Sequence, residues 1–135
     1  MNSTKTVNYQ SYILEDYTNA IKEFSAGIDT FRLSVDPKVI KSMDNKSKLA
    51  TICQLYTNRS LCYFSLNQHD KAIEDADYVA TNLDPKNAKA FFRKGLSLAK
   101  MGKTQDAIAE LQRAVKLEPG NELYTNELAS LRKSK

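Results

Sequence analysis

The feature that most constrains this sequence is an internal repeat with a period of about 34 residues. Asn58–Tyr63 aligns with Arg93–Leu98, and the phrase Leu83-Asp84-Pro85 returns one period later as Leu117-Glu118-Pro119. A period of this length is typical of stacked helical hairpins, each of which buries its apolar face only against its neighbours. The sequence therefore predicts an all-α array of helix–turn–helix units.

A third copy of the pattern lies upstream and is displaced. Tyr17–Ile28 carries the Ala-x-x-x-Phe spacing of a second hairpin helix, but the interval from Ala20 to Ala72 is much longer than one period. The surplus falls within Leu33–Thr51, which begins with an Asp-Pro turn signal and becomes helical in character from about Lys46. We therefore predict an insertion, a longer loop plus extra helix, between the first and second repeats.

The interval between the second and third repeats is one residue too long. Ala72 and Ala107 are small residues of the kind found where the two helices of a hairpin cross, and their separation exceeds the period by one residue. The extra residue falls within Ala76–Asn82. We therefore expect a distorted helix end in that segment.

The predicted architecture is a right-handed α-superhelix of seven helices, made of three hairpins and one closing helix. The first repeat spans about 1–33, the insertion 34–52, the second repeat 53–86 and the third repeat 87–120. The last hairpin needs a capping helix with one polar face. Residues 121–133 supply it, with apolar side chains at helical spacing at Leu123, Tyr124, Leu128 and Leu131.

Composition argues against several classes of protein. One histidine, four glycines and no glycine-rich phosphate loop leave little from which to assemble a catalytic site, so we expect neither an enzyme nor a cofactor. Without a long apolar run or a signal sequence, we expect no membrane contact and a cytoplasmic location. The net charge is +4, but its 20 basic residues are dispersed among 16 acidic ones, which argues against nucleic acid as a partner.

The two cysteines favour a structural role. Cys53 and Cys62 lie on one predicted helix at a spacing that points them to opposite sides, so they cannot bridge each other. No second cysteine pair is present and His69 is the only histidine, which argues against a metal site. We expect buried thiols.

Polar residues on the first helix of each repeat are the candidate binding residues, because these helices line the concave side of such an array. Lys89 and Arg93 are one helical turn apart and form a two-cation fork suited to carboxylates. Asn58 occupies in the second repeat the place of Arg93 in the third, and Lys5 lies on the first repeat's inner helix. The alternative is that these are solvated charges on a groove wall.

The segments Leu55–Ser60 and Ala88–Gly95 resemble those of the tetratricopeptide-repeat co-chaperones with a carboxylate clamp. That family binds the Glu-Glu-Val-Asp tails of heat-shock proteins 70 and 90. The resemblance covers nearly the whole chain outside the insertion, and it implies that four of the five clamp positions match, at Lys5, Asn58, Lys89 and Arg93. It also implies a heat-shock protein 90 or 70 tail as the partner.

The fifth clamp position departs from the family, which has Asn where this chain has Tyr9. A phenol is longer than an amide and reaches past the place where the amide would donate, so we expect a weakened clamp that lacks one hydrogen bond. Leu61, Phe64 and Leu96 are predicted to form an apolar floor for an aliphatic side chain of the peptide. Packing of these three residues in the core between repeats is an equally good interpretation.

Two other functions remain open at this point. The chain could be a scaffold of a chaperone-linked assembly factor, binding other partners through its convex face or its insertion. It could also be the targeting module of a larger enzyme. A short peptide ending in Asp distinguishes these functions, because a clamp should bind its free acid and not its amide.

Overall fold

The computed structural model describes the backbone of residues 2–34 and 46–133, together with the side chains of residues 15–32 and 47–133. Both ranges contain helices and no strand, which confirms the all-α prediction. The elements in chain order are α1 (Asn2–Ser34), α3 (Lys46–Ser65), α4 (His69–Tyr78), the π-helical segment η1 (Val79–Leu83), α5 (Ala88–Lys100), α6 (Thr104–Leu117) and α7 (Glu122–Lys133).

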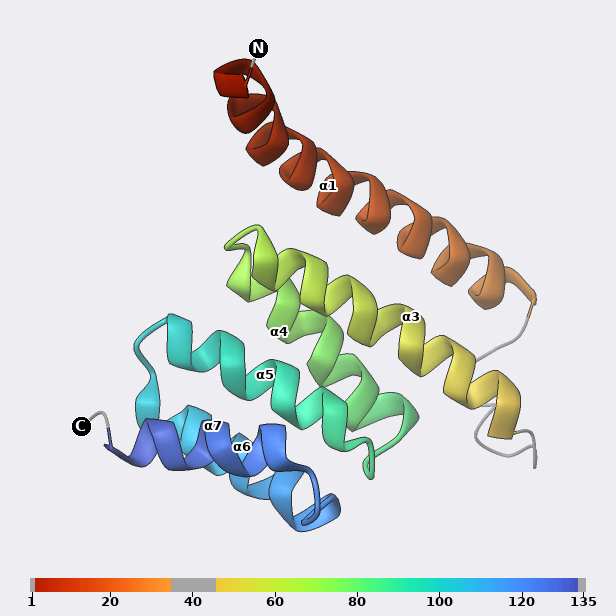
Figure 1. The fold of residues 1–135 in the computed structure, drawn as a ribbon. Helices are drawn as coiled ribbons and strands as arrows, with labels where there is room; N and C mark the ends of the chain where they lie inside the picture. The colour runs from red at the N-terminus through yellow and green to blue at the C-terminus, as the bar shows by residue number, and fades with distance from the viewer. Residues whose placement is uncertain (1, 35–45, 134–135) are drawn as a thin grey trace.

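Helices that follow one another in the chain pack as hairpins, and the hairpins stack along one direction (Figure 1). α3 packs against α4, α5 against α6, and α7 covers α6 as the predicted closing helix. Both hairpin turns contain one residue with a left-handed φ, Asn67 at 62° and Gly102 at 81°. Each turn closes with a Schellman-type hydrogen bond, from Gln68 N–H to Tyr63 O at 2.8 Å and from Lys103 N–H to Leu98 O at 2.9 Å.

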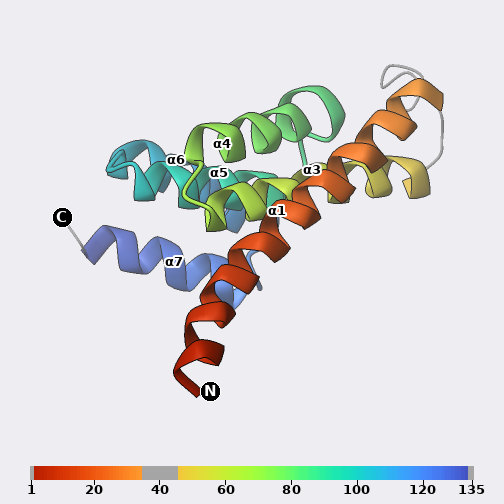
Figure 2. The same ribbon diagram turned by 90° about the horizontal axis from the view of Figure 1, so that it is seen from above.

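The structure differs from the sequence prediction in the first repeat. Residues 2–34 form one continuous helix where a hairpin is predicted over 1–33, so the described ranges hold six α-helices and not seven. The physical reason is local, because no glycine or proline precedes Gly27 and nothing interrupts the helical hydrogen bonds. The C-terminal half of α1 packs on α3, and its N-terminal end projects away from the other helices (Figure 2). Ala20 is therefore half-buried instead of lying at a hairpin crossing.

The predicted extra helix before the second repeat is present. α3 begins at Lys46, as expected, and its 20 residues compare with 13 in α5. The insertion therefore adds turns to the N-terminal end of α3. Residues 35–45 of the predicted insertion lie outside the described residues.

The extra residue between the second and third repeats is absorbed at the end of α4, as predicted. Asp84 N–H donates to Val79 O at 2.7 Å, and this pairing of a residue with the fifth one before it is the hydrogen bond of a π-turn. A π-turn holds one more residue than an α-turn, so it takes up a single insertion without shifting the rest of the helix. Val79 and Leu83 stay buried on the same face, at 0% and 2% exposure.

The core has two apolar clusters. The first joins α1, α3 and η1 to Ala90 of α5 and includes Ile28, Ile52 and Tyr56. The second joins α5, α6 and α7 and includes Phe92, Leu111, Tyr124 and Leu128. Ala72 and Ala107 are fully buried, as the crossing positions require. At Gly95 a Cβ atom would lie 3.0 Å from Leu111 Cγ, so α5 and α6 approach closely there.

Candidate functional site

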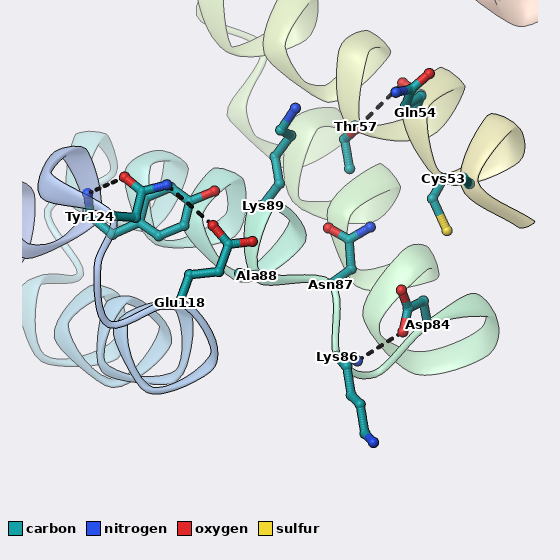
Figure 3. A pocket seen from close by; sticks show the side chains of 12 residues that line it. Cys53, Gln54, Thr57, Asp84, Lys86, Asn87, Ala88, Lys89, Glu118 and Tyr124 are labelled. Carbon is teal, nitrogen blue, oxygen red and sulfur yellow. Dashed lines mark hydrogen bonds between the residues drawn. The ribbon is translucent and has the colours of Figure 1, made fainter. Parts of the chain in front are cut away.

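A groove of about 460 Å³ lies between α3, α5 and α7, on the side of the stack formed by the first helices of the repeats (Figure 3). Gln54 and Thr57 of α3 line one wall, and Lys89 of α5 lies between that wall and the opposite side. Glu118 and Tyr124 line the side next to α7. The groove therefore runs across successive repeats.

Two asparagines set where the groove helices begin. Asn87 Oδ1 accepts from Ala90 N–H at 3.0 Å, and Asn121 Oδ1 accepts from Tyr124 N–H at 3.3 Å. Side-chain oxygens at this position satisfy amides that the first helical turn leaves free. Because Asn121 follows Asn87 by one repeat period, α5 and α7 enter the groove in the same register.

Of the predicted site residues, Lys89 lines the groove, whereas Arg93 and Asn58 are not among the lining residues. Lys89 is exposed and lines the groove, and Arg93 follows one turn later on the same helix. Arg93 is half-buried, and burial lowers the pKa of its guanidinium. Its Nε is buried and has no hydrogen-bond partner, while its Cζ lies 5.9 Å from the centroid of the Phe92 ring. Asn58, on α3, is half-buried.

Arg93 contrasts with two other partly buried cations. Arg59 donates from Nε and Nη2 to the Asp75 carboxylate, both at 2.7 Å, and Lys94 lies 2.8 Å from Asp77 Oδ1 and 3.6 Å from Glu110 Oε1. Arg93 forms no salt bridge with any side chain in the described ranges. A buried charge is normally paired, because removing it from water is unfavourable. Arg93 is therefore a partly buried cation without a carboxylate partner in the described part of the chain.

Acidic residues are distributed unevenly around the groove. The sequences of α3 and α5 contain no Asp or Glu, whereas α4, the outer helix of the second hairpin, contains four in ten residues. The carboxylates that line the groove come from connecting segments, at Asp84 and Glu118. The two central helices thus present only neutral and positive side chains to a ligand.

None of the three residues predicted to form an apolar floor is among the residues that line the groove. Leu61, Phe64 and Leu96 are all half-buried. Leu96 packs against the cluster of α5, α6 and α7, so it serves the core between repeats. The Phe64 ring makes an edge contact with His69, with 5.4 Å between ring centroids, at the turn from α3 to α4. Lys5 and Tyr9 lie on α1, but their side chains are outside the described residues.

Several groove residues were not found from the sequence, namely Gln54, Thr57, Glu118 and Asn121. Asn121 follows Asn87 by one repeat period, and this spacing could have identified Glu118 and Asn121 from the sequence. Cys53 and Cys62 are free and buried, as predicted, and burial raises the pKa of the Cys53 thiol to about 11. None of the helices described by the structure is long and apolar enough to cross a membrane.

Comparison with known proteins identifies the repeats. Family models of the tetratricopeptide repeat match residues 88–121 and 54–77. The chain is 37% identical over 75 residues to small glutamine-rich tetratricopeptide repeat-containing protein 2 of Mycosarcoma maydis, covering 56% of this chain and 21% of that protein. It is 34% identical over 116 residues to protein unc-45 homolog B of Xenopus laevis, covering 86% of this chain and 11% of that protein. The chain thus matches about a fifth or less of the length of these relatives.

Solved structures extend the likeness to the fold. The first tetratricopeptide domain of Spaghetti (RPAP3), bound to the HSP90 peptide SRMEEVD, is 26% identical with a TM-score of 0.61, covering 91% of this chain and 90% of that one. The first such domain of human RPAP3 is 27% identical with a TM-score of 0.60, covering 89% and 87%. The second domain of human RPAP3, in complex with the HSP70 peptide SGPTIEEVD, is 21% identical with a TM-score of 0.59, covering 87% and 99%, and shows the likeness of the fold alone.

Proposed function

We propose that this chain, which carries tetratricopeptide repeats and is a protein-interaction domain, is an adaptor for the acidic C-terminal tail of a heat-shock protein 90 or 70. The tail lies in the groove between α3, α5 and α7. The observation that carries this proposal is Arg93, a partly buried guanidinium with no carboxylate partner among the described residues. The lack of any acidic residue on α3 and α5 supports the same ligand chemistry.

In the proposed complex, Lys89 and Arg93 donate charge-assisted hydrogen bonds to carboxylates of the tail. They stand one turn apart on α5, so two carboxylates of one extended peptide are within their reach. Asn58 contributes an amide from α3 to the terminal carboxylate. Lys5 and Tyr9 belong to the proposal as further contacts from α1, with Tyr9 leaving one hydrogen bond unmade. Because the N-terminal end of α1 projects away from the other helices, these two contacts require that end to approach the groove when the peptide binds.

The relatives support a peptide of this kind as the ligand. The structure of the Spaghetti (RPAP3) domain, at 26% identity, was solved with an HSP90 peptide that ends in Glu-Glu-Val-Asp. The HSP70 peptide in the human RPAP3 complex ends in the same four residues. We therefore use the HSP90 peptide SRMEEVD as the probe, and a parallel titration with the HSP70 peptide SGPTIEEVD decides between the two chaperones.

Charge reversal tests the proposal. Lys89→Glu or Arg93→Glu should reduce the affinity for SRMEEVD about 10- to 100-fold or more, because a charge-assisted hydrogen bond is lost and a repelling charge is added. Lys116→Glu, an exposed reversal in the last turn of α6, is the matched control and should bind normally. Isothermal calorimetry measures the affinity, and circular dichroism verifies that helicity is kept.

Normal binding by either folded groove variant would place the ligand elsewhere on the molecule. A loss of affinity in Lys116→Glu as large as in the groove variants would mean that only net charge matters. Raising the salt concentration should weaken binding of the parent protein, since the groove charges are partly exposed.

A further inference from the structure

The repeat register continues into α7, where the positions equivalent to the two cations of α5 carry no positive charge. Lys89 and Arg93 on α5 have counterparts one period later at Leu123 and Glu127 on α7. The capping hydrogen bonds of Asn87 and Asn121 begin the two helices at equivalent positions, which supports this alignment. An apolar residue and an acid therefore stand on α7 where two cations stand on α5.

The residue at the first of these α7 positions is unusually exposed. Leu123 has 55% of its surface exposed, against 38% for Leu117 and 37% for Met101, the other exposed large apolar residues in the described ranges. Nothing in the fold of the described residues requires an apolar side chain there. Glu127, one turn later, is half-buried, so Leu123 and Glu127 form one continuous strip along α7.

A second carboxylate joins this strip from the segment before α7. Glu118 lines the same groove as Lys89 (Figure 3), and its Oε1 accepts from Asn121 Nδ2 at 3.2 Å, which orients it. Glu118 also acts on the phenol of Tyr124. Burial raises the pKa of Tyr124 most, the negative charge of Glu118 raises it further, and the positive charge of Arg93 lowers it. Tyr124 is thus influenced by the positive end of the groove and by its negative end.

The two ends are close enough for one short peptide to contact both. Phe92 of α5 and Tyr124 of α7 are in contact, with ring centroids 4.6 Å apart, so the two helices are neighbours. Packed helices have axes about 8–10 Å apart, and an extended chain advances about 3.4 Å per residue. A peptide whose carboxylates bind on α5 therefore reaches α7 within about three residues.

We propose that the surface of α7 beside the groove, formed by Leu123 and Glu127 together with Glu118 of the groove lining, selects a basic residue two or three positions before the acidic tail of the bound peptide. The aliphatic stem of an arginine or lysine covers Leu123, and its charged head lies between the two carboxylates. This selection rests on the proposed function, since it presumes that the acidic tail binds on α3 and α5. The groove then recognises the order of charges along the peptide, a base followed by acids.

Three peptides that differ at one position test the selection: SRMEEVD, SQMEEVD and SEMEEVD. The parent protein should bind them in the order Arg, Gln, Glu, with about two- to five-fold between successive peptides, the size of a solvent-exposed ion pair. Glu127→Lys should remove the preference for Arg, because the new cation offsets Glu118, the one carboxylate of the strip that is left. Asp106→Lys, the same reversal at an exposed acid in the first turn of α6, is the matched control and should keep the preference.

Each outcome decides the matter. Equal affinity of the parent protein for all three peptides refutes the selection and leaves the proposed function standing. An unchanged preference for Arg in Glu127→Lys also refutes it, because the α7 strip would then play no part. If the parent protein binds none of the peptides, the proposed function fails and the selection fails with it.

Discussion

Deleting one residue from the π-helical segment should be nearly harmless, because that segment already holds one residue too many. Deletion of Thr81, which is exposed, shortens the interval from Ala72 to Ala107 to one repeat period. The hydrogen bond from Asp84 N–H to Val79 O, at 2.7 Å, now closes a π-turn. After the deletion this N–H and this carbonyl are four residues apart, which is the spacing of the ordinary α-helical hydrogen bond.

The expected change in the free energy of unfolding depends on which buried side chains the deletion displaces. Val79 and Leu83, at 0% and 2% exposure, become neighbours three positions apart on one helical face, so both can stay buried. We expect the free energy of unfolding to change by less than about 1 kcal/mol. Deletion of Glu74, an exposed residue in the α-helical part of α4, instead moves Asp75 away from Arg59. Breaking a buried pair of this kind costs about 3–5 kcal/mol.

Urea unfolding followed by circular dichroism separates the two deletions. With a slope of about 1–3 kcal/mol per M, the Glu74 deletion should lower the midpoint by at least about 1 M, and the Thr81 deletion should barely shift it. Equal destabilisation by the two deletions would refute the reasoning. It would mean that the π-turn is required by the packing and does not merely absorb an insertion.

Three further predictions concern the core, the thiols and the clamp. Ala107→Glu should lower the free energy of unfolding by about 3 kcal/mol or more in a urea titration, because it buries an unpaired charge. Gly95→Ala should lower the free energy of unfolding by about 1–3 kcal/mol, because the added methyl group overpacks the crossing of α5 and α6. A urea midpoint like that of the parent protein in either variant would contradict the close helix crossing. Cys53 and Cys62 should resist iodoacetamide at pH 8 in native protein and react in denaturant, because burial raises the pKa of both thiols and keeps them protonated. Rapid labelling of the native protein would contradict their burial. Tyr9→Asn should raise the affinity for a free-acid peptide about three- to ten-fold by calorimetry, as one added hydrogen bond would, whereas a fall would show that Tyr9 itself contacts the peptide.

Much of the fold follows from the sequence because its signals are local and repeated. The repeat period and the small residues at Ala72 and Ala107 are readable without coordinates, and so is the surplus residue that becomes η1. The continuous helix α1 could not be foreseen from the repeat pattern. A hairpin there depends on tertiary contacts, since no glycine or proline marks a turn before Gly27.

The candidate site was less accessible to sequence reasoning. Lys89 and Arg93 could be identified from their spacing, but Arg59 and Arg93 look alike in sequence. Only the structure shows that Arg59 is neutralised by Asp75 across the second hairpin, whereas Arg93 has no carboxylate partner in the described ranges. Glu118 follows Asp84 by one repeat period, so its position could be read from the sequence, but only the structure shows that both carboxylates line the groove.

The central claim is that the groove holds a peptide by its terminal and side-chain carboxylates, and one titration tests it most directly. The parent protein is titrated by calorimetry with SRMEEVD as the free acid and with the same peptide amidated at its C-terminus. The account predicts that the free acid binds and that amidation weakens binding by about ten-fold or more, because at least one charge-assisted hydrogen bond is lost. Equal affinity for the two peptides, or binding of neither, would contradict it.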